Sequence, residues 1–130
     1  MVTIGRLRVA VATPSPALAA RIAMVITEAG HEAALVSHSP FDAMEAAFSR
    51  AVEVLILDQE LQRLTGSEIA TVVRTVGAAV SVVVLHRGEL ASADDLLVLD
   101  PTRPGFDGAL ANVLDRLGAD DAAGTPRRAG

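Results

Sequence analysis

The chain has 130 residues, a formal net charge of -5, a hydrophobic share of 51% and no cysteine. This length suits one domain with its own core, and the hydrophobic share excludes a disordered chain. The missing cysteines exclude a disulfide framework and a thiolate metal site. The acidity argues against nucleic acid or an anionic membrane as a direct partner. With three phenylalanines and neither Trp nor Tyr, the chain is also poorly equipped to stack bases or a flavin ring.

The amino-terminal segment imitates a secretory signal peptide. Arg6 and Arg8 precede the apolar run Val9–Ala12, but Thr13-Pro14 interrupts that run, whereas a signal peptide needs roughly 7–15 apolar residues. The sequence also contains no segment of the ~18 apolar residues that a membrane span requires. We therefore expect a cytoplasmic protein.

Short apolar runs alternate with helical patterns along the chain, and the runs are apolar on both faces, as parallel strands covered by helices are. In chain order we predict a strand at Leu7–Ala12, a helix at Pro16–Ala29, a strand at Ala33–Val36, a helix opened by Ser39-Pro40, a strand at Val54–Leu57, a helix opened by Thr65, strands at Val80–Leu85 and Leu96–Leu99, and a helix from about Gly105 to Leu117. This alternation predicts an open, doubly wound α/β sheet with right-handed crossovers.

Local signals mark the helices. Ser15 is placed to cap the first helix, and Gly30 to end it. In the second helix Phe41, Met44 and Phe48 share one face, which we expect to be its packed face. The third helix opens with the capping-box spacing of Thr65 and Glu68. The apolar stripes of the last two helices are Ile69, Val72, Val73 and Val76, and Leu110, Val113, Leu114 and Leu117.

We expect one domain over residues 1–117 and a flexible C-terminal tail over residues 118–130, where the sequence is small, polar and without periodicity. His31 and His38 flank the second predicted strand, where we expect both to be exposed to solvent. In a doubly wound sheet the chemistry sits at the carboxyl edge of the strands. The residues that follow the first, third, fourth and fifth predicted strands there are Thr13-Pro14, Asp58-Gln59-Glu60, His86-Arg87 and Asp100-Pro101.

At these positions the chain resembles the receiver domain of bacterial two-component response regulators. The apolar run Val54–Leu57 ends in Asp58, Gly66 follows eight residues later, and Asp100-Pro101 stands where that family has Lys-Pro. The resemblance covers nearly all of residues 6–117. It implies a flavodoxin-like five-stranded parallel sheet of strand order 2-1-3-4-5, with Asp58 as the candidate phosphoacceptor.

The resemblance also implies a site that has lost most of its charges. In that family, Mg²⁺ is held by the phosphoacceptor, an acidic residue or pair after the first strand and one backbone carbonyl, while a lysine and a hydroxyl contact the phosphoryl group. Here Thr13 and Pro14 take the place of the acidic pair. His86 takes the place of the hydroxyl and Asp100 that of the lysine. Asp58 remains, with the backbone carbonyl of Glu60 as a second metal ligand.

We therefore predict that Mg²⁺ binds weakly or not at all, with a dissociation constant weaker than millimolar, because few carboxylates remain. Since the chain contains no lysine, Arg87 and Arg103 are the candidates for a replacement cation. Asp100 could also return one carboxylate to a metal site shared with Asp58.

Asp58, His86 and Asp100 should converge at the edge of the sheet. One carboxyl pKa should then rise unless a cation intervenes, and His86 is the nearest candidate, with a raised pKa of its own. We expect Thr13 to cap the first helix. We also expect a cis peptide bond before Pro101, as in the resembling family.

The stretch between His86 and Asp100 is too short for the family's fourth helix. We therefore predict a shortened or missing fourth helix and uncovered apolar surface near Val82, Val84 and Leu97. Exposed apolar patches usually mark an interface, so a dimer or a partner contact is expected there.

The sequence favours a receiver-like signalling module that acts through protein–protein contacts, without the standard Mg²⁺-dependent aspartyl phosphorylation switch. Its partners would be a histidine kinase, an output protein or a second copy. The alternative is a working phosphorelay regulator that is phosphorylated on Asp58. A small phosphatase with Asp58 as nucleophile and His86 as acid/base is disfavoured, because Asp58-Gln59-Glu60 lacks the second aspartate of aspartyl phosphatases. We expect neither an enzyme nor a bound cofactor.

Overall fold

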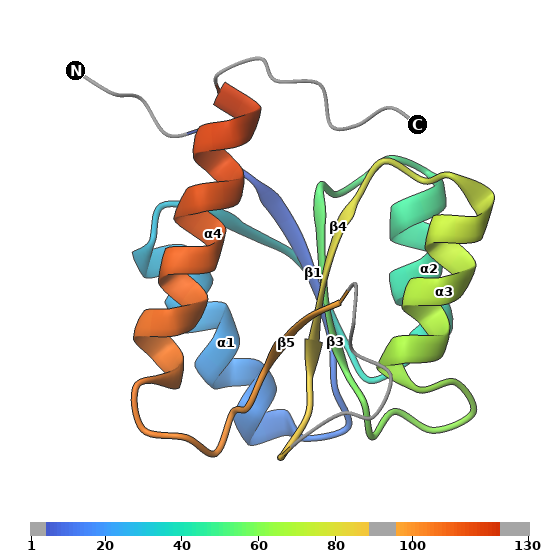
Figure 1. Cartoon of the computed structure of the whole chain (residues 1–130), viewed down its shortest axis with the longest axis horizontal. Coiled ribbons are helices and arrows are strands. Elements are labelled where there is room, and N and C mark those ends of the chain that lie inside the picture. The colour runs from blue at the N-terminus through green and yellow to red at the C-terminus, as the bar shows by residue number, and fades with distance from the viewer. Residues whose placement is uncertain (1–4, 89–95, 123–130) are drawn as a thin grey trace.

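The computed structural model of the chain, shown in Figure 1, describes residues 5–88 and 96–122, and the side chains up to residue 119. Five parallel strands form one sheet in the order β2-β1-β3-β4-β5. This confirms the predicted fold class and strand order. The elements are β1 (Arg8–Ala12), α1 (Pro16–Glu28), β2 (Glu32–Ser37), α2 (Pro40–Phe48), β3 (Val54–Asp58), α3 (Gly66–Val76), β4 (Ser81–Leu85), β5 (Leu97–Leu99) and α4 (Phe106–Ala122).

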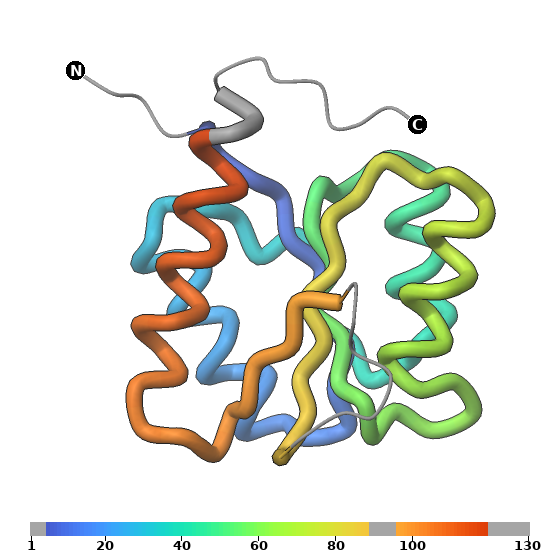
Figure 2. The backbone as a smooth tube through the Cα atoms, in the orientation of Figure 1, coloured from blue at the N-terminus to red at the C-terminus, as the bar shows by residue number. Residues whose placement is uncertain are grey.

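Helices cover both faces of the sheet. Figure 1 shows α1 and α4 together on one face, and α2 and α3 on the other; Figure 2 traces the same path through the backbone. Large aliphatic side chains and Phe106 fill the first face. The second face is filled partly by alanines of β1 and α2. All residues of β3 are buried, because this strand has a neighbour on each side and helices on both faces. The carboxyl end of β3 therefore lies at the centre of the sheet edge.

The packed face of α2 differs from the predicted one. Ala43, Ala46 and Ala47 are buried against the sheet, whereas the side chains of Phe41 and Phe48 are 48% and 46% exposed. Alanines let the helix backbone approach the sheet closely, so that the larger side chains are left at its flank. The expectation that the Phe41–Met44–Phe48 stripe forms the packed face was wrong for the two phenylalanines, while Met44 is half-buried and packs against this core.

Two expectations about exposure and length are also corrected. His31 is buried, since its Nδ1 accepts a hydrogen bond from the Leu7 amide at 3.1 Å and its Nε2 lies 3.4 Å from an Asp115 carboxylate oxygen. Helix α4 continues to Ala122, five residues beyond the predicted end at Leu117, through part of the segment assigned to the tail. Residues 123–130 lie outside the described part of the chain.

The predicted shortening of the fourth helix falls on residues 89–95, which lie outside the described residues. At the neighbouring strands, Leu97 is exposed, as expected. Val84 is fully buried, so the expectation of uncovered apolar surface at Val84 was wrong. The described residues contain no cis peptide bond, and the bond before Pro101 is therefore trans, contrary to the family-based expectation. None of the helices in residues 5–88 and 96–122 has the length and apolar character needed to cross a bilayer.

Candidate functional site

Asp58 is the last residue of β3, and only 3% of it is exposed. Its Oδ2 accepts a hydrogen bond from the Thr13 hydroxyl at 2.7 Å, and its Oδ1 accepts one from the Glu60 amide at 2.8 Å. Both oxygens of the carboxylate are thus engaged by the protein itself. A buried charge of this kind is tolerated when hydrogen bonds replace its hydration.

Thr13 lies at the end of β1, next to β3, and is also almost fully buried. Its hydroxyl donates to Asp58 and accepts the Ser15 amide at 3.2 Å, so both hydrogen-bonding roles of the side chain are used. Ser15, not Thr13, caps α1, by accepting from the Leu18 amide. The predicted capping role of Thr13 was therefore wrong, whereas the predicted cap at Ser15 is confirmed.

The loop after Asp58 is held tightly to the start of α3. A Cβ added to Gly66 would lie 2.9 Å from the Leu57 carbonyl oxygen and 3.2 Å from that of Asp58, so only glycine fits without a shift. The Gln59 amide exchanges two hydrogen bonds with Ser67, at 2.8 and 2.9 Å. The Asp58–Gly66 spacing therefore reflects a close approach of α3 to the end of β3.

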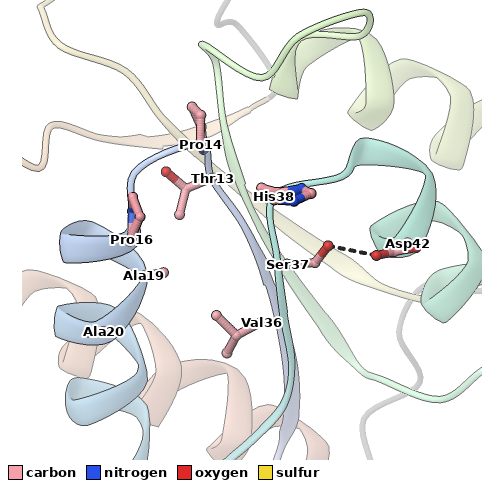
Figure 3. Close-up of a pocket in the computed structure, with 9 residues that line it drawn as sticks. All are labelled: Thr13, Pro14, Pro16, Ala19, Ala20, Val36, Ser37, His38 and Asp42. Carbon is pink, nitrogen blue, oxygen red and sulfur yellow. Dashed lines mark hydrogen bonds between the residues drawn. The ribbon is translucent and has the colours of Figure 1, made fainter.

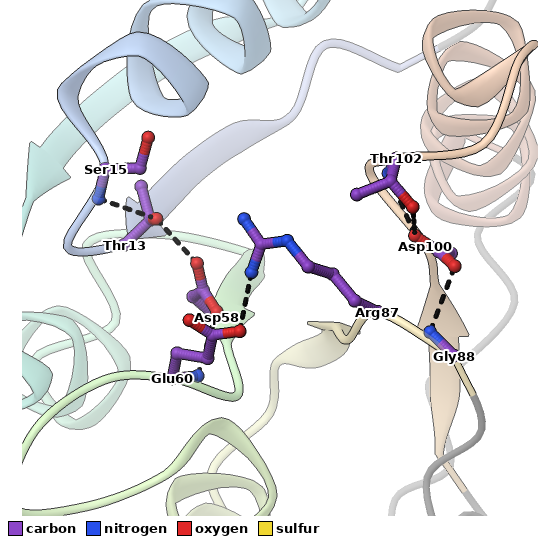
Figure 4. Close-up of polar contacts among 8 residues, drawn as sticks. All are labelled: Thr13, Ser15, Asp58, Glu60, Arg87, Gly88, Asp100 and Thr102. Carbon is purple, nitrogen blue, oxygen red and sulfur yellow. Dashed lines mark hydrogen bonds and ion pairs between the residues drawn. The ribbon is translucent and has the colours of Figure 1, made fainter.

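An arginine from the end of β4 reaches the Asp58 side of the edge. Arg87 Nη1 lies 2.6 Å from Glu60 Oε2, in an ion pair whose side chains are 44% and 59% exposed. Figure 4 shows the Arg87 side chain pointing toward Asp58 and Glu60 and away from Asp100. The other candidate cation, Arg103, is highly exposed and lies 3.7 Å from Asp100. Of the two arginines, Arg87 is the better placed to replace the missing lysine.

Asp100, which follows β5, is held by its own turn and by the amide of Gly88 after β4. Its Oδ1 accepts from the Thr102 hydroxyl and amide at 2.6 and 2.9 Å, and its Oδ2 accepts from the Gly88 amide at 3.0 Å. The Thr102 hydroxyl first, then the Gly88 and Thr102 amides, lower the pKa of Asp100 from 3.8 to about 2. The direction is opposite to the rise expected for two carboxylates that repel one another.

The strand ends do bring Asp58, His86 and Asp100 to one edge of the sheet, but the two carboxylates have separate partners. Among the described contacts, none joins Asp58 to Asp100. His86 is half-buried at the end of β4, and its amide donates to the Leu99 carbonyl at 3.0 Å. Its role as a cation in the pocket stays a prediction. Pro101 is buried, and its carbonyl accepts from Arg21 at 3.1 Å, which ties it to α1 rather than to Asp58.

The residues that could contact a metal ion at this edge are few. Within residues 5–88 and 96–122, no three His, Asp or Glu residues are grouped so that they could hold an ion. Asp58 and the Glu60 carbonyl remain as the candidate ligands, and the first of them is already occupied by two donors. A magnesium ion would share an Asp58 oxygen with the Thr13 hydroxyl or with the Glu60 amide, and it would find no second carboxylate among the candidate ligands. The fit of the site to Mg²⁺ is therefore poor.

Several contacts of this edge were not predicted. The Thr13–Asp58 hydrogen bond joins residues 45 positions apart, and the Arg87–Glu60 ion pair joins residues 27 apart. Only the Asp100–Thr102 pair carries a local signal, because an aspartate two residues before a hydroxyl commonly forms such a turn.

No protein-family model and no curated protein sequence matches the chain. Solved structures do. A DNA-binding response regulator of the LuxR family from Staphylococcus aureus superposes with a TM-score of 0.75 at 18% identity, over 86% of this chain and 98% of the other. The receiver domain of a sensor histidine kinase from Pseudomonas aeruginosa PAO1, with a magnesium ion in its active site cleft, gives 0.71 at 16% identity, over 86% and 97%. The response regulator domain of Thermotoga maritima CheB gives 0.70 at 16%, over 88% and 97%. The chain has the receiver-domain fold.

Proposed function

We propose that this chain is a receiver-like signalling module that acts through protein–protein contacts in the cytoplasm, without the Mg²⁺-dependent aspartyl phosphorylation switch. The receiver-domain fold supports a role in two-component signalling. In this proposal the partners are a histidine kinase, an output protein or a second copy, and the chain performs no catalysis of its own.

The observation that carries the proposal is that Asp58 is closed, by which we mean that it is buried and that both its oxygens accept hydrogen bonds. To attack a phosphodonor, a carboxylate oxygen must be reachable and its charge must be balanced by a cation. Asp58 is 3% exposed, and each of its oxygens already accepts a hydrogen bond. The two positions after β1 where metal-binding carboxylates would be expected are occupied by Thr13 and Pro14, and neither has a carboxylate. The hydroxyl of Thr13 is used to hold Asp58 in place of a metal ion.

One observation favours the alternative of a phosphorylated regulator. Arg87 brings a guanidinium to the Asp58 side of the edge, where it pairs with Glu60. A guanidinium can bind two phosphoryl oxygens in a bidentate manner, whereas a lysine ammonium neutralises them as a single point charge. In that alternative Arg87 would leave Glu60 and neutralise the new phosphoryl group.

Incubation with acetyl phosphate and Mg²⁺, followed by intact mass measurement, separates the two. The proposal expects no gain of a phosphoryl group by the wild-type protein. A double variant, Thr13→Asp with Pro14→Asp, restores the acidic pair and is expected to be modified more than the wild type. A gain in the wild-type protein that disappears in Asp58→Asn and falls in Arg87→Gln would overturn the proposal in favour of the alternative.

A further inference from the structure

A cavity of about 610 Å³ opens beside the Asp58 site, between α1 and the end of β2. Figure 3 shows Thr13, Ala19 and Val36 facing the space between these two elements, with Asp42 at its rim on the α2 side of β2. The lining residues are Thr13, Pro14, Pro16, Ala19, Ala20, Val36, Ser37, His38 and Asp42. The cavity thus shares one residue, Thr13, with the site that holds Asp58.

The cavity is left unfilled because the side chains that line it are small. Ala19 and Ala20 present only methyl groups from α1, and Pro16 closes the first turn of that helix. β2 is the edge strand of the sheet, so no further strand packs beside Val36, whose side chain is left 45% exposed. The result is an apolar wall open to solvent at the sheet edge, within the range of volumes, roughly 300–1,000 Å³, that ligand pockets have.

The polar lining of this cavity includes one carboxylate and the imidazole of His38. Asp42 is the acidic residue of the cavity lining, and the Ser37 hydroxyl donates to its Oδ2 at 2.7 Å. A second hollow of about 480 Å³, on the other side of β2, is lined by Asp42 again and by Glu45. Neither lining contains an arginine. Both hollows thus place the Asp42 carboxylate beside apolar walls, a combination that suits a cation carried on an apolar stem.

We propose that the cavity binds a cationic side chain of a protein partner, an arginine or lysine that follows an apolar residue in the partner's chain. The apolar residue and the aliphatic stem would lie on Val36 and the alanines of α1, while the cationic group would pair with Asp42. This inference rests on the proposed function, because it assigns a surface to the partner contacts proposed there.

Binding in the cavity has a consequence for the neighbouring site. Thr13 lines the cavity and donates its hydroxyl hydrogen to Asp58, and its amide donates to the Ser37 carbonyl at 3.0 Å. A partner side chain in the cavity therefore contacts the residue that keeps Asp58 closed. The amides of Thr13 and Asp58 should both report its arrival.

The test is an NMR titration of the full chain with the dipeptide acetyl-Leu-Arg-amide, and with acetyl-Leu-citrulline-amide as its uncharged match. We expect saturable shifts at Thr13, Val36 and Asp58 with the arginine dipeptide, and affinity at least fivefold weaker for the citrulline dipeptide. Asp42→Asn keeps an acceptor for Ser37 but removes the charge, and it should weaken arginine-dipeptide binding roughly fivefold. Glu28→Gln, at the opposite end of α1 from the cavity, removes an exposed charge elsewhere and should leave binding unchanged.

A second variant distinguishes binding in the cavity from an indirect effect of the Asp42→Asn substitution. Ala20 is exposed, so Ala20→Phe fills the cavity without disturbing the core, and it should abolish the shifts. Equal affinity for both dipeptides, equal loss in Glu28→Gln, or shifts that avoid Thr13 and Val36 would overturn the inference. The dipeptides carry no phosphoryl group, so this result is independent of the acetyl phosphate experiment, and either can fail alone.

Discussion

Two strands of the sheet end in an aspartate, and the two carboxylates are held in different ways. Asp58, at the end of β3, is buried and accepts a hydrogen bond from Thr13 on another strand end. Asp100 follows β5, the outer strand at the same carboxyl edge of the sheet, and accepts from Thr102, two residues later in its own turn. Each carboxylate has a threonine hydroxyl as donor, but only the first pairing crosses the fold.

This contrast distinguishes the site around Asp58 from the turn that holds Asp100. Asp58 accepts one local hydrogen bond, from the Glu60 amide, but its threonine donor comes from the end of β1 and is in place only when β1 and β3 are assembled. Asp100 accepts from Thr102 in its own turn and from the Gly88 amide after β4, and its lowered pKa follows from these donors. The position of Asp100 at the sheet edge therefore does not make it a second member of the Asp58 site.

The largest effect is expected from crowding the backbone beside Asp58. Gly66→Ala places a methyl group against the carbonyl oxygens of Leu57 and Asp58 and should lower the free energy of unfolding by about 2–3 kcal/mol. Gly108→Ala, in α4, meets no atom within 4 Å and should raise it by about 0.5–1 kcal/mol. Urea denaturation measures both. Equal effects of the same sign would contradict the close approach at Gly66.

The two threonines should differ next. Thr13→Val removes the donor to a buried carboxylate and should lower the free energy of unfolding by about 2 kcal/mol. Thr102→Val acts on an exposed turn and should cost less than about 1 kcal/mol. Thr13→Ser, which keeps the hydroxyl, serves as the control and should recover most of the loss. If the two valine variants are equally stable, the site and the turn are not energetically distinct.

Local sequence signals predicted local structure well. The caps at Ser15 and Thr65 were found because the donor and acceptor lie three residues apart. The apolar run at Val54–Leu57 predicted β3 to within one residue, since a buried strand is apolar on both faces.

Contacts between distant segments were missed. His31 is buried because Leu7 and Asp115, 24 and 84 residues away, provide its polar partners. The position of Asp58 at the sheet edge was predictable, but its closure by Thr13 was not, because any hydroxyl in that loop could equally have pointed to solvent. Helix α2 was misjudged because alanine carries little periodic signal, yet alanines form its packed face.

The acid dependence of the turn is the next smaller effect. Because folding lowers the pKa of Asp100 from 3.8 to about 2, its contribution to stability is present above pH 3.8 and is lost as pH falls toward 2. The difference in unfolding free energy between the wild type and Asp100→Asn should therefore shrink across that window. A carboxyl-carbon NMR titration should find the low pKa in the wild type and a higher one in Thr102→Val. An unperturbed Asp100 in the wild type would contradict the turn geometry.

The smallest effect is expected from the exposed ion pair. Glu60→Gln breaks the contact with Arg87, but both side chains are largely in solvent, so the free energy of unfolding should change by less than about 0.5 kcal/mol. The change should diminish further at high salt. Denaturation at low and high ionic strength checks it, and a loss above 1 kcal/mol that persists in salt would show that the pair is part of the closed Asp58 site.

Calorimetric titration with Mg²⁺ tests most directly whether the Thr13 hydroxyl holds the Asp58 carboxylate where a metal ion would otherwise bind. We expect a dissociation constant weaker than millimolar for the wild type, and tighter binding for the Thr13→Asp, Pro14→Asp double variant, which returns two carboxylates to the end of β1. Micromolar binding by the wild-type protein, lost in Asp58→Asn, would contradict this role of Thr13.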